Sequence, residues 1–238
     1  EARLDEYKTI GKVCSDAFTD AVIIDGHRVV ATAKRRTTKD NLMNGIGEAL
    51  DAVLEGYDTS NIEQVTLSTT VVTNTIVEEK EQVVDLYVVT GPGRNVDDIF
   101  PVKPIYLQGY TDHRGIVVEH TPADAVRGIA NMVQARSGTD LAAVSAKFGV
   151  RNPQEELSIT EELKNTYHTI SNGSLLSGSL NFPRRTISAY FNSAVTPVFT
   201  VFKKNVEDAL SARNIVAPLH ILKADGGSLP IEHMVSRP

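Results

Sequence analysis

The spacing of hydrophobic residues changes from segment to segment along the chain, and each change marks a predicted strand or helix. Short apolar runs predict β-strands at "DAVIID", "HRVVATAK", "EQVTLSTT", "VVDLYVVTG", "GIVVEH", "DLAAVSAKFG" and "PLHILKADGG". Asp25-Gly26, between the first two runs, predicts a β-hairpin. Helical spacing predicts helices at 38–56, 121–136 and 153–167, the second with Thr121 as its cap. The alternation of strands and helices predicts an α/β fold with a mixed sheet.

The longest hydrophobic stripe runs from Ile187 to Leu210 and keeps a helical spacing for many turns. Pro197 lies inside it and should kink or split the helix, because proline removes a backbone hydrogen bond. We expect the stripe to be core and not a partner surface, so that Phe191→Ala costs about 3–5 kcal/mol. We also expect the residues from Asp20 to Phe148 to form one sheet-based lobe.

The composition is ordinary for a soluble globular protein, with 238 residues, 41% of them hydrophobic and 23% charged. A net charge of -6 without a long basic run argues against nucleic acid or an anionic membrane as the main partner. No apolar stretch reaches membrane-spanning length, and the charged N-terminus does not resemble a signal peptide. The single cysteine, Cys14, excludes an internal disulfide, so we expect a cytoplasmic location.

Three predicted strand ends carry small polar or glycine residues. In α/β proteins such ends bind ligands, because backbone N–H groups and helix dipoles point there. The three ends are Ser15–Asp20, Thr69–Asn74 and Asp225–Ser228. For Asp225–Ser228 the alternative is a tight turn in which glycine supplies a positive φ.

Further candidates lie outside these strand ends. Asp112-His113-Arg114 is either a substrate or interface cluster or a solvated loop. Thr73 and Asn74 either bind a ligand or cap a short helix. Arg184, beside Arg185, either binds a carboxylate or packs against acidic neighbours at a helix start. The six histidines lack the spacing of metal ligands, so no zinc site is expected.

Several long stretches, in order along the whole chain, together resemble a known family. They are "FTDAVIID", "STTVVTNTIVE", "PVKPIYLQGYTDHRG", "KFGVRNP", "SGSLNFPRRTISAYFNSAV" and "APLHILKADGGSLPIEHMVSRP". The family is that of the ATP-dependent hydantoinases and 5-oxoprolinases, and the resemblance is to its N-terminal-type (A or α) subunit. The resemblance implies a hydantoinase/oxoprolinase N-terminal domain over 8–182 and the start of a second hydantoinase A lobe over 183–238. The chain would then be the leading part of a longer subunit.

The resemblance implies a ribonuclease H-like fold related to actin, the heat-shock chaperone ATPases and the sugar kinases. Such an enzyme uses ATP and Mg²⁺ to phosphorylate the ring carbonyl of 5-oxoproline, a hydantoin or a related lactam, and a larger B- or β-type subunit or domain hydrolyses it. Related subunits belong to acetone or acetophenone carboxylases. The implied nucleotide-binding residues are Ser15, Thr19, Asp20, Asp225, Gly226, Gly227 and Ser228, and the implied substrate or interface residues are Thr73, Asn74, Asp112, His113, Arg114 and Arg184.

The first phosphate turn departs from the family pattern. Val13 stands at the family's aspartate, Ser15 and Asp16 stand at its two glycines, and Ala17 stands at its threonine. Side chains at the glycine positions fill the space that phosphates need, and an aspartate repels them. Two functions therefore remain open: the nucleotide-handling part of an ATP-dependent hydrolase, or a degenerate, non-catalytic subunit that keeps the fold and the partner surface.

Overall fold

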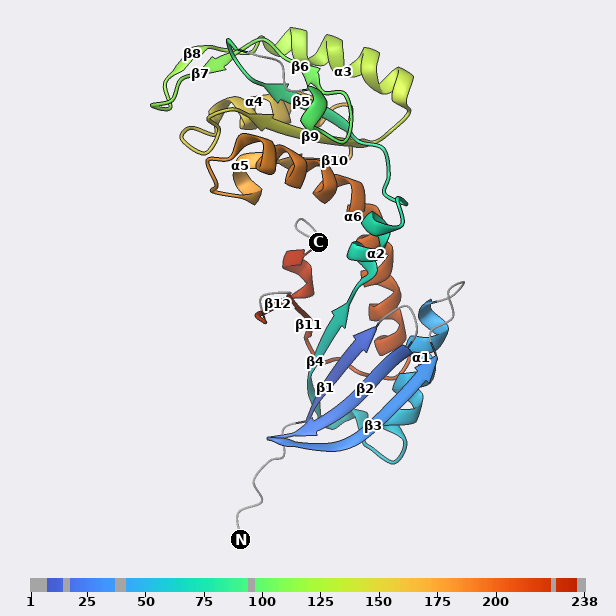
Figure 1. Cartoon of the computed structure of the whole chain (residues 1–238). Coiled ribbons are helices and arrows are strands. Elements are labelled where there is room, and N and C mark those ends of the chain that lie inside the picture. The colour runs from blue at the N-terminus through green and yellow to red at the C-terminus, as the bar shows by residue number, and fades with distance from the viewer. Residues whose placement is uncertain (1–7, 15–17, 37–41, 94–96, 224–225, 235–238) are drawn as a thin grey trace. The chain divides into compact units, whose positions relative to one another are not determined.

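The computed structural model (Figure 1) describes residues 8–14, 18–36, 42–93, 97–223 and 226–234. The chain divides into two compact units: unit 1 consists mainly of Glu1–Glu78 and Val198–Ser236, and unit 2 of Glu79–Pro197. The prediction of one lobe from Asp20 to Phe148 is therefore wrong, because the chain leaves unit 1 after Glu78. The predicted domains, 8–182 and 183–238, do not coincide with these units and stay a prediction about the family's domains.

Unit 1 is built on a six-stranded mixed sheet with the order β12-β11-β4-β1-β2-β3. β1, β4 and β11 are parallel, and β2, β3 and β12 pair antiparallel to their neighbours. The predicted hairpin is present between β2 and β3, where Gly26 has a φ of 55°. The strands are β1 (Lys8–Cys14), β2 (Phe18–Asp25), β3 (Arg28–Arg36), β4 (Ile62–Thr69), β11 (Leu219–Leu222) and β12 (Ser228–Pro230).

The core of unit 1 lies on one face of this sheet. Two helices cover that face: α1 (Leu42–Leu54) and the second half of α6 (Phe182–Ser211). Alternate residues of each strand point into this core, as the period of two in a strand requires. A short helix, α2 (Val71–Val77), follows β4. The buried core residues include Ile10, Ala21, Ile23, Ile46, Leu50, Val65, Leu67, Phe199, Phe202, Val206 and Ile221.

Unit 2 is built on a four-stranded parallel sheet with the order β10-β9-β5-β6, next to a small hairpin of β7 and β8. β10 was not predicted, because its four residues are too short to show a period. The elements are β5 (Asp85–Val89), β6 (Ile105–Tyr106), β7 (Tyr110–Thr111), β8 (Val117–Glu119), α3 (Ala123–Ser137), β9 (Leu141–Ala146), α4 (Gln154–Leu163), β10 (Thr169–Asn172) and α5 (Gly173–Leu176). Short 3₁₀ turns lie at Thr59–Asn61, Asp97–Ile99 and Ile231–Met234.

Helices cover both faces of this sheet, so β5 and β9 are buried along their whole length. Tyr87 and Val89 face α3 and α4, and Leu86 and Val88 face the first half of α6. A strand buried on both faces reads as a continuous apolar run, as the sequence predicted here.

α6 supplies both cores. Ala189 and Tyr190 pack in unit 2, and Phe202 and Val206 pack in unit 1. The expectation that this stripe is core is confirmed, but Phe191 is only partly buried, so the fully buried Phe199 is the better test. The helix continues through Pro197 without being split. Among the described residues, no helix is both long and apolar enough to cross a membrane.

Candidate functional site

The parallel strands of unit 1 end together at one edge of the sheet. β4 lies between β11 and β1, with Thr69 opposite Cys14 and Leu67 opposite Ile221. Because the three strands are in register, the chain leaves each of them at the same edge. The ends of β1, β4 and β11, which lead into the three stretches predicted to bind a ligand, are therefore neighbours in space. We call this the carboxyl edge of unit 1.

β2 begins at this edge, and β3, which runs in the same direction as β1, ends at it. One row across the sheet joins Thr69, Cys14, Thr19 and Arg35, and neighbouring strands lie about 4.8 Å apart. Thr19 is fully buried, on the core side of β2. Ser15 and Asp225 lie outside the described residues, as does Asp16.

The carboxylate of Asp20, which was predicted to bind a nucleotide, interacts with a lysine on the surface of the sheet. It forms an ion pair with the Lys34 ammonium at 3.2 Å, and the two side chains are 43% and 60% exposed. At that exposure an ion pair contributes at most about 1 kcal/mol. The same ammonium lies 4.8 Å from the centre of the Phe18 ring, a cation–π contact. Asp20 and Phe18 therefore hold Lys34 at the carboxyl edge.

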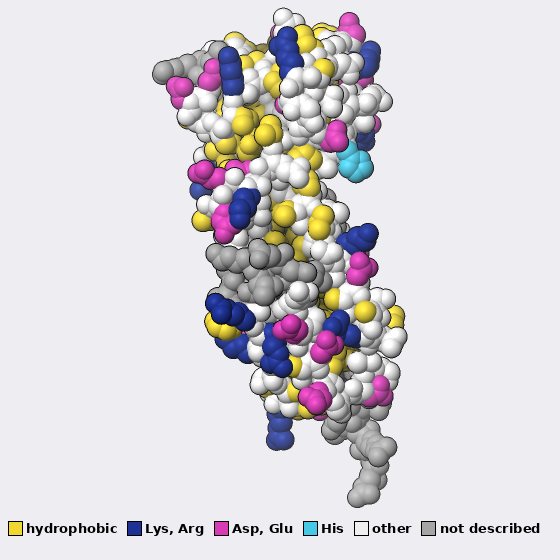
Figure 2. All heavy atoms as spheres, turned by 90° about the vertical axis from the view of Figure 1, so that its right-hand side faces the viewer, with side chains coloured by type: hydrophobic (Ala, Val, Ile, Leu, Met, Phe, Trp, Pro, Cys, Tyr) yellow, Lys and Arg dark blue, Asp and Glu magenta, His cyan; other side chains and the backbone are white. Residues whose placement is uncertain are grey.

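Three consecutive cations, Lys34, Arg35 and Arg36, close β3 at this edge. The Arg35 guanidinium donates to the Lys34 carbonyl at 2.9 Å. Arg36 is opposite Phe18 in the register and exposed, and its side chain makes no hydrogen bond or ion pair with any residue that the structure describes. Figure 2 shows dark blue Lys and Arg side chains gathered on this face of unit 1. Asp20 pairs with only one of these three cations, so the end of β3 keeps a net positive charge, which attracts anions.

The residues after β4 cap a short helix. Thr69 Oγ1 accepts a hydrogen bond from the backbone N–H of Val71 at 3.2 Å, and Asn74 Nδ2 donates to Thr70 Oγ1 at 2.9 Å. Thr73 is exposed on α2. α2 begins at Val71 with Thr70 as its N-cap, so Thr73 and Asn74 lie inside the helix and the alternative that they cap it is wrong. Ligand binding by Thr73 and Asn74 stays a prediction.

The glycine turn after β11 is a tight hairpin. Lys223 N–H donates to the Gly227 carbonyl at 2.7 Å, and Gly226 N–H donates to the Lys223 carbonyl at 3.0 Å. Gly226 has a φ of 86°, which favours glycine. A Cβ added there would meet no atom within 4 Å, so the turn has open space beside its backbone. Ser228 begins β12 directly after the turn.

The predicted cluster at 112–114 lies in unit 2 and works as a turn. The Asp112 carboxylate accepts hydrogen bonds from the backbone N–H groups of Ile116 and Arg114, both at 2.9 Å, and from Arg114 Nε at 2.8 Å. The Ile116 bond and, after it, Arg114 lower the pKa of Asp112 to about 2. His113 is exposed. This loop therefore contains a stabilised carboxylate, and of the three predicted residues His113 and Arg114 are exposed to solvent.

Arg184 is exposed in the first turn of α6, where its N–H donates to Asn181 Oδ1 at 3.0 Å. The buried residue is Arg185, whose guanidinium donates to the carbonyls of Ser179 and Ala146, each at 2.7 Å. Burial lowers the pKa of this guanidinium, and the nearby Glu156 opposes that shift. Arg185 precedes the buried Ala189 by four residues, and this helical spacing was the signal that it points inward.

Glu156 and Glu155, which the sequence analysis did not single out, are buried in α4 and bind loop backbone. Glu156 accepts from Ala146 N–H and Ser174 N–H, both at 2.7 Å. Glu155 accepts from Thr121 N–H at 2.9 Å, and its other oxygen lies 2.6 Å from His120 Nδ1. The sequence of α4 looks polar throughout, so nothing in it indicates that these two carboxylates are buried. Within the described residues, no three His, Cys, Asp or Glu side chains are grouped as metal ligands would be.

The fold is shared with two ATP-dependent enzymes. The nucleotide-free acetone carboxylase has a TM-score of 0.73 at 15% identity over 95% of this chain and 38% of that chain. The ATP-dependent caprolactamase from Pseudomonas jessenii has a TM-score of 0.72 at 16% identity over 94% of this chain and 36% of that chain. The predicted class, an α/β fold with mixed sheets of the actin-like ATPase type, is confirmed.

The chain belongs to the hydantoinase/oxoprolinase N-terminal region family, whose sequence profile matches residues 16–167. It spans somewhat more than a third of each of the two solved chains. No curated protein sequence matches it significantly.

Proposed function

We propose that this chain is the nucleotide-handling part of an ATP-dependent enzyme that activates the carbonyl of a small cyclic amide, such as 5-oxoproline, a hydantoin or another lactam, by phosphorylation. The observation that carries this proposal is the carboxyl edge of unit 1. Three parallel strand ends meet there beside the basic end of β3, in a family and fold that include ATP-dependent enzymes. A larger hydrolytic subunit or domain would complete the reaction.

The groups at this edge fit the phosphates of ATP. The turn at Gly226 leaves open space beside its backbone, so a phosphate group can approach this turn closely. Arg36 offers a guanidinium without a protein partner in the described residues. Ser228 and Thr73 offer hydroxyl groups at the ends of their elements. Mg²⁺ would be held mainly by the phosphates and water. Bound Mg-ATP would supply the phosphoryl group.

A second function is favoured by the altered first turn: a subunit that keeps the fold but no longer uses ATP. Asp16 would repel a phosphate about 4 Å away by about 4 kcal/mol at an effective dielectric near 20. That repulsion corresponds to about a thousandfold in affinity. The likeness to acetone carboxylase and to caprolactamase is equal in degree, so a carboxylase-type subunit remains the further alternative.

Calorimetric titration of Mg-ATP distinguishes these functions. With the rest of the subunit present, the chain is compared with a variant that carries Val13→Asp, Ser15→Gly, Asp16→Gly and Ala17→Thr together. We expect the restored turn to bind Mg-ATP much more tightly, and Asp16→Gly alone to recover only the repulsive part. If the restored variant binds Mg-ATP no better than the unaltered chain, the nucleotide cleft was lost elsewhere, which favours the non-catalytic function.

A further inference from the structure

β3 is an edge strand of the six-stranded sheet in unit 1. It pairs with β2 on one side only, and Figure 1 shows it as the outermost strand of this sheet. Apart from the ladder with β2, no backbone group of β3 bonds to another backbone group that the structure describes. The outer side of β3 therefore presents a row of N–H and C=O groups with which a further strand can pair.

The backbone groups that face away from β2 belong to Thr32, Lys34 and Arg36. Lys34 is opposite Asp20 in the register, and the side chains of this pair meet at 3.2 Å. Opposite side chains approach most closely where the two residues do not bond through their backbones. The Lys34 carbonyl also accepts from the exposed Arg35 guanidinium at 2.9 Å. Because backbone direction alternates along a strand, Thr32 and Arg36 face outward as Lys34 does.

The available part of this edge begins after Val30. The Val30 carbonyl accepts from the Tyr57 hydroxyl at 3.0 Å, close to the point where the register with β2 shifts. No proline or glycine interrupts the residues that follow. We call residues 31–36 the free edge of β3.

The free edge is basic in a chain that is acidic overall. It contains Lys34, Arg35 and Arg36 and no acidic residue, whereas the net charge of the chain is -6. Charges on edge strands commonly prevent pairing between copies, and a second copy here would bring two sets of cations together. The same cations attract a strand that carries acidic side chains. The charge of the free edge therefore favours an acidic partner over a second copy of this chain.

We propose that the free edge of β3 binds an extended, acidic segment of a partner protein, which joins the sheet as a further strand. The N–H groups of Thr32, Lys34 and Arg36 donate to carbonyls of the segment. Its acidic side chains lie beside the Lys34 and Arg36 side chains, on the exposed face of the sheet. In strand addition, main-chain hydrogen bonds supply affinity and side chains supply selectivity.

Fluorescence anisotropy on the full chain tests the free edge with a labelled peptide in which valine and glutamate alternate. We expect saturable binding. A peptide with lysine in place of glutamate should bind at least about fivefold more weakly, because like charges then face each other. The valine–glutamate peptide with every backbone nitrogen methylated keeps its charge but has no backbone donor. It should bind at least about tenfold more weakly than the unmethylated peptide.

A backbone variant separates strand addition from simple charge attraction. Thr32→Pro removes an outward N–H and leaves the three cations in place, so it should lower the affinity at least about tenfold. Thr32→Val keeps the N–H and is the matched control, with unchanged binding expected. Arg36→Glu should also weaken binding, whereas Lys204→Glu, at an exposed position on α6, should not. Circular dichroism establishes that each variant is folded.

The proposal is overturned if the valine–glutamate peptide does not bind, or if the lysine or the methylated peptide binds as tightly. It is also overturned if folded Thr32→Pro keeps the affinity; should this variant not fold, unchanged binding by Arg36→Glu has the same meaning. A dimer of the chain alone that the peptide dissociates in sedimentation would assign the edge to a second copy instead. Thr32→Pro should bind Mg-ATP as the unaltered chain does, so the nucleotide proposal is tested separately.

Discussion

The interiors of the two units are built from different kinds of residue. In the described part of unit 1, the buried polar side chains are two threonines, Thr19 and Thr75. Unit 2 buries several ionisable side chains as well. They are Asp85, Asp112, Glu155, Glu156 and Arg185.

The buried charges of unit 2 clamp loops. Asp112 closes the turn of the β7–β8 hairpin, Glu155 holds Thr121, and Glu156 joins the end of β9 to the start of α5. Each carboxylate accepts backbone N–H groups, which compensates for its removal from water. The comparison teaches that unit 1 depends on apolar burial and presents its charges to solvent, whereas unit 2 uses buried charges to shape its loops.

The largest expected effect tests the apolar interior of unit 1. Phe199→Ala should lower the free energy of unfolding of unit 1 by about 3–5 kcal/mol, because it leaves a cavity in a packed core. Val201→Ala on the same helix is the control, since Val201 is 59% exposed, and should cost less than about 0.5 kcal/mol. Denaturant unfolding followed by hydrogen exchange measures the change in each unit. A loss below about 1 kcal/mol for Phe199→Ala would show that this core is loosely packed.

The next effect tests the buried charges of unit 2. Glu156→Gln should cost about 1.5–3 kcal/mol, because the amide keeps one acceptor but turns an NH₂ group toward a backbone donor. Glu161→Gln, at an exposed site on the same helix, should cost less than about 0.5 kcal/mol. The measurement is again denaturant unfolding. Equal costs for the two variants would contradict the view that buried carboxylates shape unit 2.

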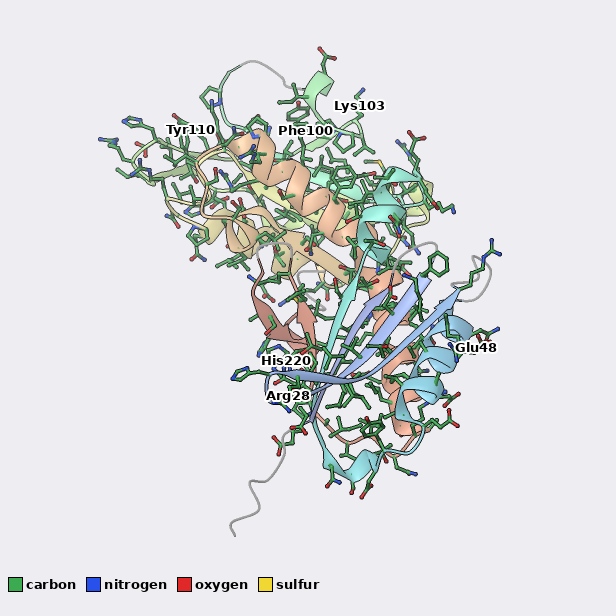
Figure 3. The ribbon with its side chains drawn as sticks, turned by 60° about the horizontal axis from the view of Figure 1, so that its bottom comes forward. Arg28, Glu48, Phe100, Lys103, Tyr110 and His220 are labelled. Carbon is green, nitrogen blue, oxygen red and sulfur yellow. The ribbon has the colours of Figure 1, made fainter. Side chains whose placement is uncertain are left out.

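A smaller effect tests the exposed cations of unit 1. Arg36→Ala should weaken Mg-ATP binding about two- to fivefold, since an exposed ion pair contributes about 0.2–1 kcal/mol. Arg28→Ala removes the same charge at the opposite end of β3, labelled in Figure 3, and should leave the affinity unchanged. Calorimetry at low and at physiological salt measures both, and the Arg36 effect should shrink as salt rises. Equal losses in the two variants would mean that net charge, not the carboxyl edge, attracts the nucleotide.

The smallest effect concerns pH and the hairpin turn. The pKa of Asp112 falls from 3.8 to about 2 on folding, so the unfolded chain binds this proton more readily. The carboxylate therefore contributes its full stability above about pH 4, and the contribution is lost as the pH falls toward 2. Asp112→Asn should make the acid loss of stability shallower in that window, whereas Asp124→Asn on exposed α3 should not. NMR titration of the Asp112 carboxyl checks the pKa itself.

Most of the strands and helices could be predicted from local patterns. The apolar runs of β5 and β9, the β2–β3 hairpin at Gly26 and the stripe of α6 follow from the period and turn chemistry of a few neighbouring residues. The motifs that matched the family predicted its fold, because they are short and contiguous. The residues of the predicted nucleotide site could be named for the same reason.

Which strands and helices pack against each other is decided only in the tertiary structure. The local sequence does not predict that β4 lies between β11 and β1. This strand order brings Thr69, Gly226 and Arg36 to the carboxyl edge of unit 1. The division of the chain after Glu78 and inside α6 also depends on which surfaces pack together. The choice of Arg185 over Arg184 for burial arises in the same way. Periodicity records which side of an element is buried, whereas its partner depends on the complementary shapes of segments far apart in the chain.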